Sequence, residues 1–224
     1  MVTDPQPTVL VFDVNETLLD IETLAPLFER LFGDAAAMRE WFAQVVLYSE
    51  AMALSGNYAP FGAVGAGILR MLGEIRGVPV VGADTAELRA RTLAMPAHDD
   101  VLPALERLKN AGFRLVTLTN SAPDLEASPL QRSGIARLTE RQFSVDAVRR
   151  FKPHPDCYRQ VAEALDLLPR PSAWWRRMYG TRLGRRVSAG PVPWWPGPAT
   201  PSCRCRTCPS PPSWRRTSAA LPTR

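Results

Sequence analysis

An aspartate placed directly after an apolar run is the residue of this sequence best suited to chemistry. Asp13 follows the run from Val9 to Phe12, and Thr17 lies four residues further on. Open α/β sheets collect their reactive groups beyond the carboxyl ends of their strands. A carboxylate held at that position can act as a nucleophile and form an ester with its substrate. We therefore take Asp13 as the candidate nucleophile.

Two further polar segments follow strand-like runs later in the chain. The apolar run 113–118 stops at the polar segment 119–121, and Lys152 comes after a weaker strand signal near 142–145. The carboxyl ends of parallel strands lie at one edge of a sheet, where open α/β folds place their ligands. We therefore expect these groups to meet Asp13 there.

The elements that must position these groups alternate between strand and helix. Residues 8–12 and 113–118 are apolar without polar alternation, which predicts strands that are buried on both faces. Residues 101–108 have the pattern of an amphipathic helix, and the pattern over 155–167 predicts another helix. Such alternation indicates a parallel sheet with right-handed crossovers. We predict an α/β fold with a doubly wound, Rossmann-like parallel-sheet core.

The segment between the first strand and the helix over 101–108 is helical in pattern throughout. Apolar residues recur at three- and four-residue spacing, and glycines separate four segments, 22–32, 36–54, 61–76 and 84–93. This pattern predicts a four-helix cap over residues 21–95. The cap is inserted into a core that consists of residues 1–20 and 96–168.

The motifs resemble those of the haloacid dehalogenase superfamily, which are an Asp-x-x-x-Thr loop, a Ser or Thr that ends the second strand, and a later Lys. The phrases FDVNETL at 12–18, LTN at 118–120 and FKP at 151–153 look like those of its type II branch, the L-2-haloacid dehalogenases. The resemblance covers roughly residues 8–168. It implies hydrolysis of small 2-haloacids through an aspartyl ester, without a cofactor.

The resemblance also implies a role for each motif residue. Asp13 would attack the carbon that bears the halide, and Lys152 would keep Asp13 ionised and fix its direction. Thr17, Thr119 and Asn120 would donate hydrogen bonds to Asp13 or to the substrate carboxylate. Water would then hydrolyse the ester.

Asn15 distinguishes dehalogenation from phosphoryl transfer. Phosphatases of this superfamily have the pattern Asp-x-Asp, in which the second Asp protonates the leaving alcohol and helps to hold magnesium. Asparagine cannot perform that proton transfer, whereas a halide leaves as a stable anion. We expect Asn15 to contact substrate and no metal to be required; a phosphatase or another small-molecule hydrolase is the alternative.

The type II enzymes also receive the halide on a cap arginine, for which Arg39 is the candidate here.

Each of these residues also has a purely structural interpretation. Asp13 and Thr17 are residue types that cap helices and turns, and the segment 119–121 has turn-forming composition. A lysine before a proline, as at Lys152, is ordinarily a solvated loop residue. Three motifs in the order of the superfamily favour a catalytic site over these interpretations.

Composition changes near residue 169. Residues 170–224 contain eleven Arg and no Lys, Asp or Glu, so a net charge of +5 for the chain leaves +5 − 11 = −6 on residues 1–169. The acidic body argues against a nucleic-acid partner, and the Pro-, Ser- and Arg-rich tail is typical of disorder. The spacing Cys203-x-Cys205-x-x-Cys208 lacks a fourth zinc ligand. We expect a cytoplasmic protein without a membrane segment, a small-molecule substrate and, as one option, a homodimer.

The tail contains a second signal when its codons are shifted by one base. Trp and Met have one codon each, so the segment 174–184 is tightly constrained, and the shifted frame permits VAAHVWDTAGA. This phrase resembles the fourth motif of the superfamily, and the sequence therefore predicts a frameshift near 168–171. The strand beside the first strand would then be missing, which predicts an exposed apolar edge, poor folding and little activity. An inactive product with a basic tail is the non-enzyme alternative.

Overall fold

The computed structural model describes residues 9–123 and 128–167, which include three strands and seven α-helices. The strands are β1 (Val9–Phe12), β2 (Arg114–Thr119) and β3 (Arg141–Ser144). The helices are α1 (Ala25–Phe32), α2 (Ala37–Ser55), α3 (Phe61–Arg76), α4 (Gly82–Leu93), α5 (Val101–Asn110), α6 (Pro129–Arg132) and α7 (Pro155–Ala164). Three 3-10 turns complete the set, η1 (Ile21–Leu24), η2 (Ile135–Arg137) and η3 (Val145–Ala147).

The three strands form one parallel sheet in the order β1-β2-β3. Phe12 at the end of β1 is in register with Thr117, and Thr119 at the end of β2 is in register with Ser144. The polar segments that follow the three strands therefore start at the same edge. The sheet thus produces the meeting of motifs that the strand pattern predicts.

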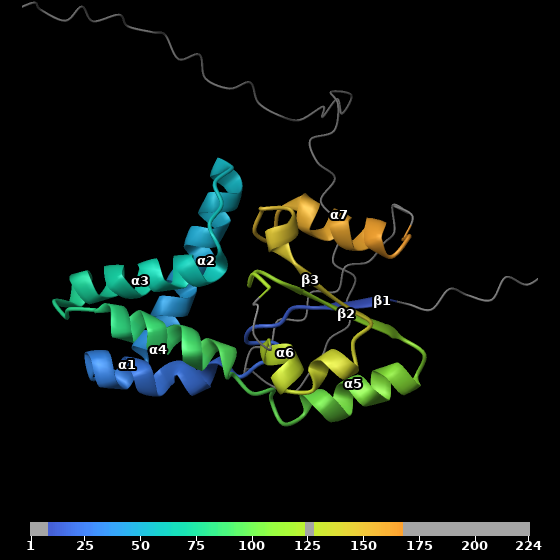
Figure 1. The fold of residues 1–224 in the computed structure, drawn as a ribbon, viewed down its shortest axis with the longest axis horizontal. Helices are drawn as coiled ribbons and strands as arrows, with labels where there is room; N and C mark the ends of the chain where they lie inside the picture. The colour runs from blue at the N-terminus through green and yellow to red at the C-terminus, as the bar shows by residue number, and fades with distance from the viewer. Residues whose placement is uncertain (1–8, 124–127, 168–224) are drawn as a thin grey trace, which may run out of the picture. The chain divides into compact units, whose positions relative to one another are not determined.

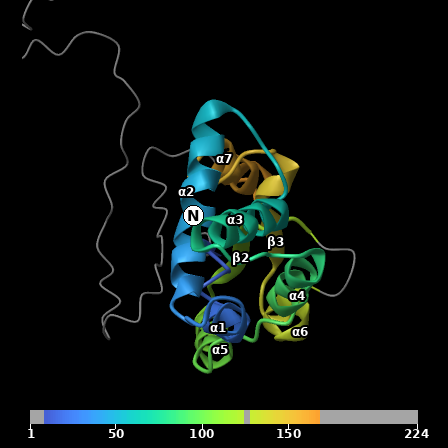
Figure 2. The same cartoon turned by 90° about the vertical axis from the view of Figure 1, so that its left-hand side faces the viewer.

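Helices cover both faces of the sheet. Figures 1 and 2 show α7 on one face and α5 on the opposite face, while α1 to α4 lie beyond the carboxyl ends of the strands. This arrangement is a doubly wound α/β core with a helical cap inserted between β1 and α5. The predicted fold class is confirmed for the described residues.

The cap helices end where the glycines of the sequence permit a reversal. Gly33 follows α1 with a φ of 64°, and Gly56 follows α2 with a φ of 76°. In each case the glycine N–H donates to a carbonyl of the preceding turn, of Glu29 and Met52 respectively. Left-handed backbone at a helix end carries little steric cost for glycine. These positions set the lengths of α1 and α2.

Two details of the sequence prediction are wrong. Residues 9–11 of β1 are half-buried and only Phe12 is buried, because β2 is the sole partner of β1 among the described residues. The last helix ends at Ala164 rather than at residue 167, since Asp166 adopts a left-handed backbone with a φ of 52°. The predictions for residues 168–224, including the frameshift and the tail, lie outside the described residues.

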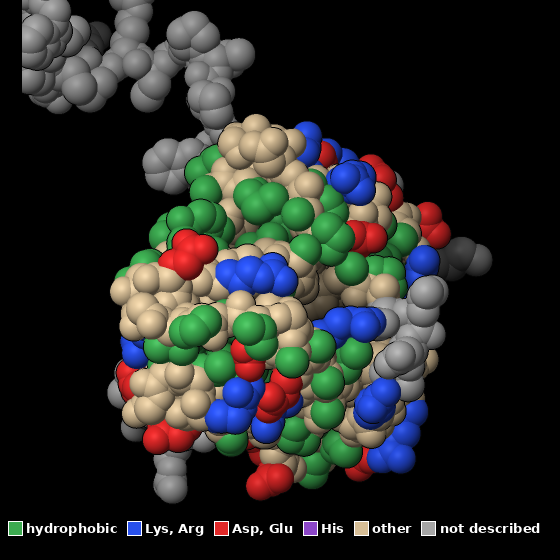
Figure 3. Space-filling model, turned by 60° about the vertical axis from the view of Figure 1, so that its left-hand side comes forward, with side chains coloured by type: hydrophobic (Ala, Val, Ile, Leu, Met, Phe, Trp, Pro, Cys, Tyr) green, Lys and Arg blue, Asp and Glu red, His purple; other side chains and the backbone are tan. Residues whose placement is uncertain are grey.

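Charge is mixed over the described surface. Figure 3 shows acidic and basic side chains of the described residues interspersed on one face. The described helices include none that is long and apolar enough to cross a bilayer.

Cys157 lies in α7, and its thiol is shielded from solvent by the core. The residue is 0% exposed, and its Sγ donates to the carbonyl of Arg150 at 3.0 Å. Burial raises the pKa of the Cys157 thiol from its ordinary 9.0 to about 11. Between those pH values the folded state keeps a proton that the unfolded state has lost, so alkali stabilises the unfolded state.

We predict that the free energy of unfolding falls by about 2 kcal/mol between pH 9 and 11 through this group. Urea unfolding at several pH values measures this fall. The variant Cys157→Ala is the control. Because it lacks the thiol, its free energy of unfolding should fall by about 2 kcal/mol less over the same pH range. Parallel pH profiles for the two proteins would contradict the prediction.

Candidate active site

Asp13 is the first residue beyond β1. Its Oδ1 accepts a hydrogen bond from the Val14 N–H at 2.8 Å, and its side chain remains 42% exposed. The carboxylate is therefore anchored on one side and accessible on another. This combination suits a group that must reach a substrate.

Lys152 supplies the charge that faces Asp13. Its Nζ lies 2.5 Å from Asp13 Oδ1 and 2.9 Å from the carbonyl oxygen of Leu118, to which it also donates. The Lys152 side chain is only 13% exposed, so water screens this ion pair less than it screens a surface pair. The short, shielded contact fixes the direction of the carboxylate.

The segment after β2 holds the loop that carries Lys152. Asn120 Oδ1 accepts from the Lys152 backbone N–H at 3.1 Å, and Thr119 Oγ1 accepts from the Ser121 N–H at 3.1 Å. Ser121 Oγ in turn accepts from Asn15 Nδ2 at 3.3 Å. The contacts of Asn15 and of Asn120 join the three motif loops to one another. The predicted contact of Thr119 and Asn120 with Asp13 or substrate stays a prediction.

The turn after Asn15 contains Glu16 and Thr17. Thr17 is half-buried in this turn, and its predicted contact with substrate stays a prediction. Glu16 adopts a left-handed backbone with a φ of 65°, which is unusual for a residue with a side chain. Its carboxylate forms an ion pair with Arg39 of α2. The same guanidinium also pairs with Glu22 of η1, so two carboxylates contact the candidate halide receptor.

A second contact between cap and core lies beside Lys152. Tyr58, between α2 and α3, donates its hydroxyl to Asp146 at 2.6 Å. The Tyr58 ring packs on the ring of Phe151 with centroids 5.0 Å apart, and Phe151 is fully buried. Burial, and then the hydrogen bond to Asp146, raises the pKa of the Tyr58 hydroxyl above its usual range. This hydroxyl therefore stays protonated and acts as a hydrogen-bond donor to Asp146.

Sequence reasoning missed the residues that join the cap to the core. Glu16 stands inside the phrase FDVNETL, so its place was visible, but its residue type suggested no role. Tyr58 and Asp146 are 88 residues apart and belong to no motif, so no spacing signal could connect them.

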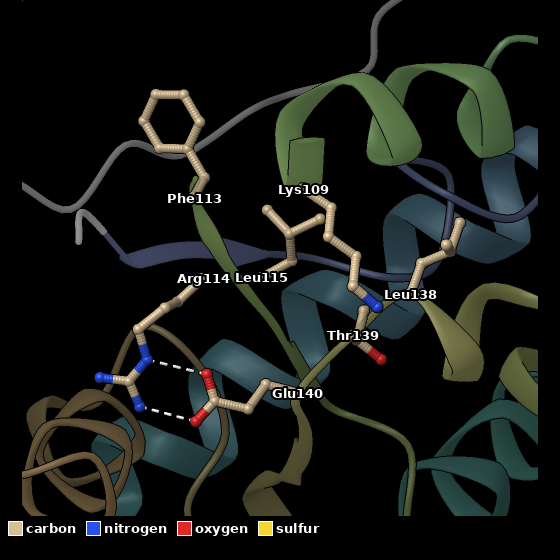
Figure 4. Close-up of a pocket in the computed structure, with 7 residues that line it drawn as sticks. All are labelled: Lys109, Phe113, Arg114, Leu115, Leu138, Thr139 and Glu140. Carbon is tan, nitrogen blue, oxygen red and sulfur yellow. Dashed lines mark hydrogen bonds and ion pairs between the residues drawn. The ribbon is translucent and has the colours of Figure 1, made fainter. Parts of the chain in front are cut away.

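A pocket at the other edge of the sheet carries no comparable chemistry. Figure 4 shows its lining, in which the guanidinium of Arg114 and the carboxylate of Glu140 form two hydrogen bonds of 2.8 and 2.6 Å. Arg114 is the first residue of β2, so this pocket lies at the amino end of the strand, whereas Thr119 is at its carboxyl end. The contact pairs both charged groups, and the candidate active site lies at the opposite edge.

The fold and the site belong to a known family. The sequence model for haloacid dehalogenase-like hydrolases matches residues 7–173, and this chain is a member of that family.

Known relatives place the chain within the type II branch. It is 33% identical over 165 residues to an (S)-2-haloacid dehalogenase of Xanthobacter autotrophicus, covering 71% of this chain and 63% of that protein. It is 27% identical to (S)-2-haloacid dehalogenase 1 of Pseudomonas sp. (strain CBS-3), over 71% of each protein. The chain therefore spans less than two thirds of the length of the Xanthobacter protein.

A solved structure gives the same result for the fold. The L-2-haloacid dehalogenase of Xanthobacter autotrophicus with chloropropionic acid covalently bound matches with a TM-score of 0.67 and 29% identity. The match covers 73% of this chain and 67% of that chain. The predicted membership of the type II branch is thereby confirmed.

Proposed function

We propose that this chain is built to hydrolyse the carbon–halide bond of small 2-haloacids, with Asp13 as the nucleophile. The observation that carries the proposal is the ion pair of 2.5 Å between Asp13 and the shielded ammonium of Lys152. Relatives named (S)-2-haloacid dehalogenases support the substrate class.

The proposed reaction has two displacement steps. An Asp13 oxygen attacks the carbon that bears the halide, a carbon–oxygen bond forms, and the halide leaves with the electron pair of the broken bond. Water then attacks the carboxyl carbon of the ester, which releases the 2-hydroxy acid and restores the Asp13 carboxylate. The Lys152 ammonium aims the attacking carboxylate in the first step and lies beside the ester in the second.

The side chains around this pair support the same reaction. Asn15 is held by Ser121 and offers no acid to a leaving alcohol, which disfavours phosphoryl transfer. Asn120 and Thr119 set the position of the loops, and Thr17 is proposed to contact substrate from the turn after Asn15. A halide leaves without a proton, so we propose that no metal is needed.

We also propose a division of the chain into parts. Residues 1–20 and 96–168 form the core, 21–95 form the cap, and 169–224 result from a frameshift. The family match ends at residue 173, close to the change in composition near 169, which supports the frameshift. Because β1 has one strand partner among the described residues, a chain with the frame restored should be more stable and more active. A cytoplasmic location remains a proposal as well.

Halide release from a panel of 2-haloacids tests this function. Ion chromatography would follow L- and D-2-chloropropionate and chloroacetate with this chain and with a frame-restored chain, each with and without EDTA. We expect release that EDTA does not reduce, preference for the L-isomer, and higher rates for the frame-restored chain. Magnesium-dependent phosphate release from p-nitrophenyl phosphate, with no halide released by either chain, would overturn the proposal in favour of a phosphatase.

A further inference from the structure

We propose that α2 positions both halves of the reacting pair, with Arg39 holding the loop of Asp13 and Tyr58 holding the loop of Lys152. The two residues stand near the start of α2 and just beyond its end. The inference rests on the proposed function for its catalytic meaning. Arg39 and Tyr58 are positioning residues here, because neither is placed on the reacting atoms.

The first contact supports a turn in a strained conformation. Glu16 has a left-handed φ of 65°, and such a backbone persists in a residue with a side chain only when its surroundings hold it. Within the turn, the Glu16 N–H donates to Leu19 at 3.0 Å. Across the cap boundary, the ion pair with Arg39 holds the Glu16 side chain. Asp13 is three residues before Glu16, so the ion pair limits the freedom of the nucleophile loop.

Arg39 is itself fixed by a second carboxylate. Its other terminal nitrogen pairs with Glu22, which belongs to η1 at the start of the cap. A guanidinium held at both ends has lost much of its rotational freedom before it meets Glu16. These contacts favour a positioning role over the halide-receiving role that the sequence suggested, because two carboxylates repel an anion at the same nitrogens.

The second contact acts on the loop before Lys152. Tyr58 donates to Asp146 of η3 and packs on Phe151, which directly precedes Lys152. Arg150 of the same loop donates to the Gly56 carbonyl at 3.0 Å. Phe151 also contacts the ring of Phe61, the first residue of α3, with centroids 6.1 Å apart. The loop of Lys152 is therefore fastened to the residues that follow α2.

The consequence concerns the distance between Asp13 and Lys152. The two residues belong to loops that are 139 positions apart, and charge-assisted contacts weaken quickly as they lengthen. Helix α2 together with the residues that follow it contacts both loops and keeps this distance constant. Loss of either fastening should loosen its own loop and lower kcat, with a smaller effect on KM.

Hydrogen exchange followed by mass spectrometry tests, without requiring turnover, whether Arg39 and Tyr58 hold the two loops in place. Arg39→Met should raise the exchange rate of amides in residues 13–19 by about two- to fivefold, the range expected for loss of a partly exposed ion pair. Tyr58→Phe should raise exchange in residues 145–152 by a similar factor. Glu16→Gln should reproduce the effect of Arg39→Met, and Arg39→Lys should restore part of the protection.

The cap supplies matched controls for both variants. Arg30 forms the same kind of double ion pair, with Asp84 and Glu87, inside the cap. Tyr48 donates to the sulfur of Met71 inside the cap. Arg30→Met and Tyr48→Phe should leave exchange in 13–19 and 145–152 unchanged, provided that each variant still melts cooperatively.

The outcomes separate this inference from the proposed function. Faster exchange in the two loops supports the positioning role even if no 2-haloacid is a substrate, in which case only the proposed function fails. Unchanged exchange in Arg39→Met and Tyr58→Phe overturns the positioning role. Unchanged exchange together with weaker inhibition of Arg39→Met by chloride would assign Arg39 to halide instead.

Discussion

Asp13→Asn is expected to lower kcat/KM for halide release by at least about 10⁴-fold, the scale seen when a covalent nucleophile is removed. The amide keeps the size of the side chain but lacks the charge that attacks carbon. The rate of halide release by the purified variant, measured with L-2-chloropropionate, checks this expectation.

A matched control separates lost chemistry from lost structure. Asp34 is a partly exposed aspartate that pairs with Arg76 inside the cap, and Asp34→Asn should keep its activity within about threefold because surface ion pairs contribute little. Far-UV circular dichroism and a thermal melt of Asp13→Asn should match those of the parent chain. Near-parental turnover by Asp13→Asn would rule out Asp13 as the nucleophile.

Lys152→Met is expected to lower kcat by about 100- to 1000-fold, comparable to the loss of one charge-stabilising donor in other enzymes. The variant removes the ammonium that lies 2.5 Å from Asp13 while it keeps an unbranched side chain of similar length. Because methionine leaves no unpaired buried charge, the free energy of unfolding should change by no more than about 1 kcal/mol. Steady-state kinetics and urea unfolding measure the two effects.

The chain contains one other lysine, which provides the control. Lys109 lies at the end of α5, where it donates to the Arg137 carbonyl at 3.2 Å. Lys109→Met removes the same charge from the chain and should leave kcat unchanged. Equal losses in Lys109→Met and Lys152→Met would mean that net charge, and not the contact with Asp13, sets the rate.

Much of the fold follows from local pattern. The apolar runs before Asp13 and Thr119 and the periodicity of the cap each reflect a short-range rule, and the structure places strands and helices there. Burial of β1 was predicted wrongly, because it depends on a neighbouring strand that is distant in sequence. Local pattern predicts that Val9 is in a strand, but it does not determine how many other strands pair with that strand.

The candidate site shows the same division. The meeting of Asp13 with Lys152 could be predicted because each follows a strand of one parallel sheet, and such ends converge by topology. The partners of Arg39 could not be predicted, since they depend on where α2 lies over the sheet. Its charge suggested an anion receptor, whereas its position places it on Glu16.

The central claim is that Asp13 becomes covalently attached to its substrate, and one turnover in ¹⁸O-labelled water tests it most directly. Enzyme in excess over L-2-chloropropionate would be digested after a single turnover, and the mass of the peptide that contains Asp13 would be measured by mass spectrometry. We predict that one heavy oxygen enters the Asp13 carboxylate and that the 2-hydroxy acid contains none. Heavy oxygen in the product, with none in the Asp13 peptide, would show that water attacks the substrate itself and would contradict the account.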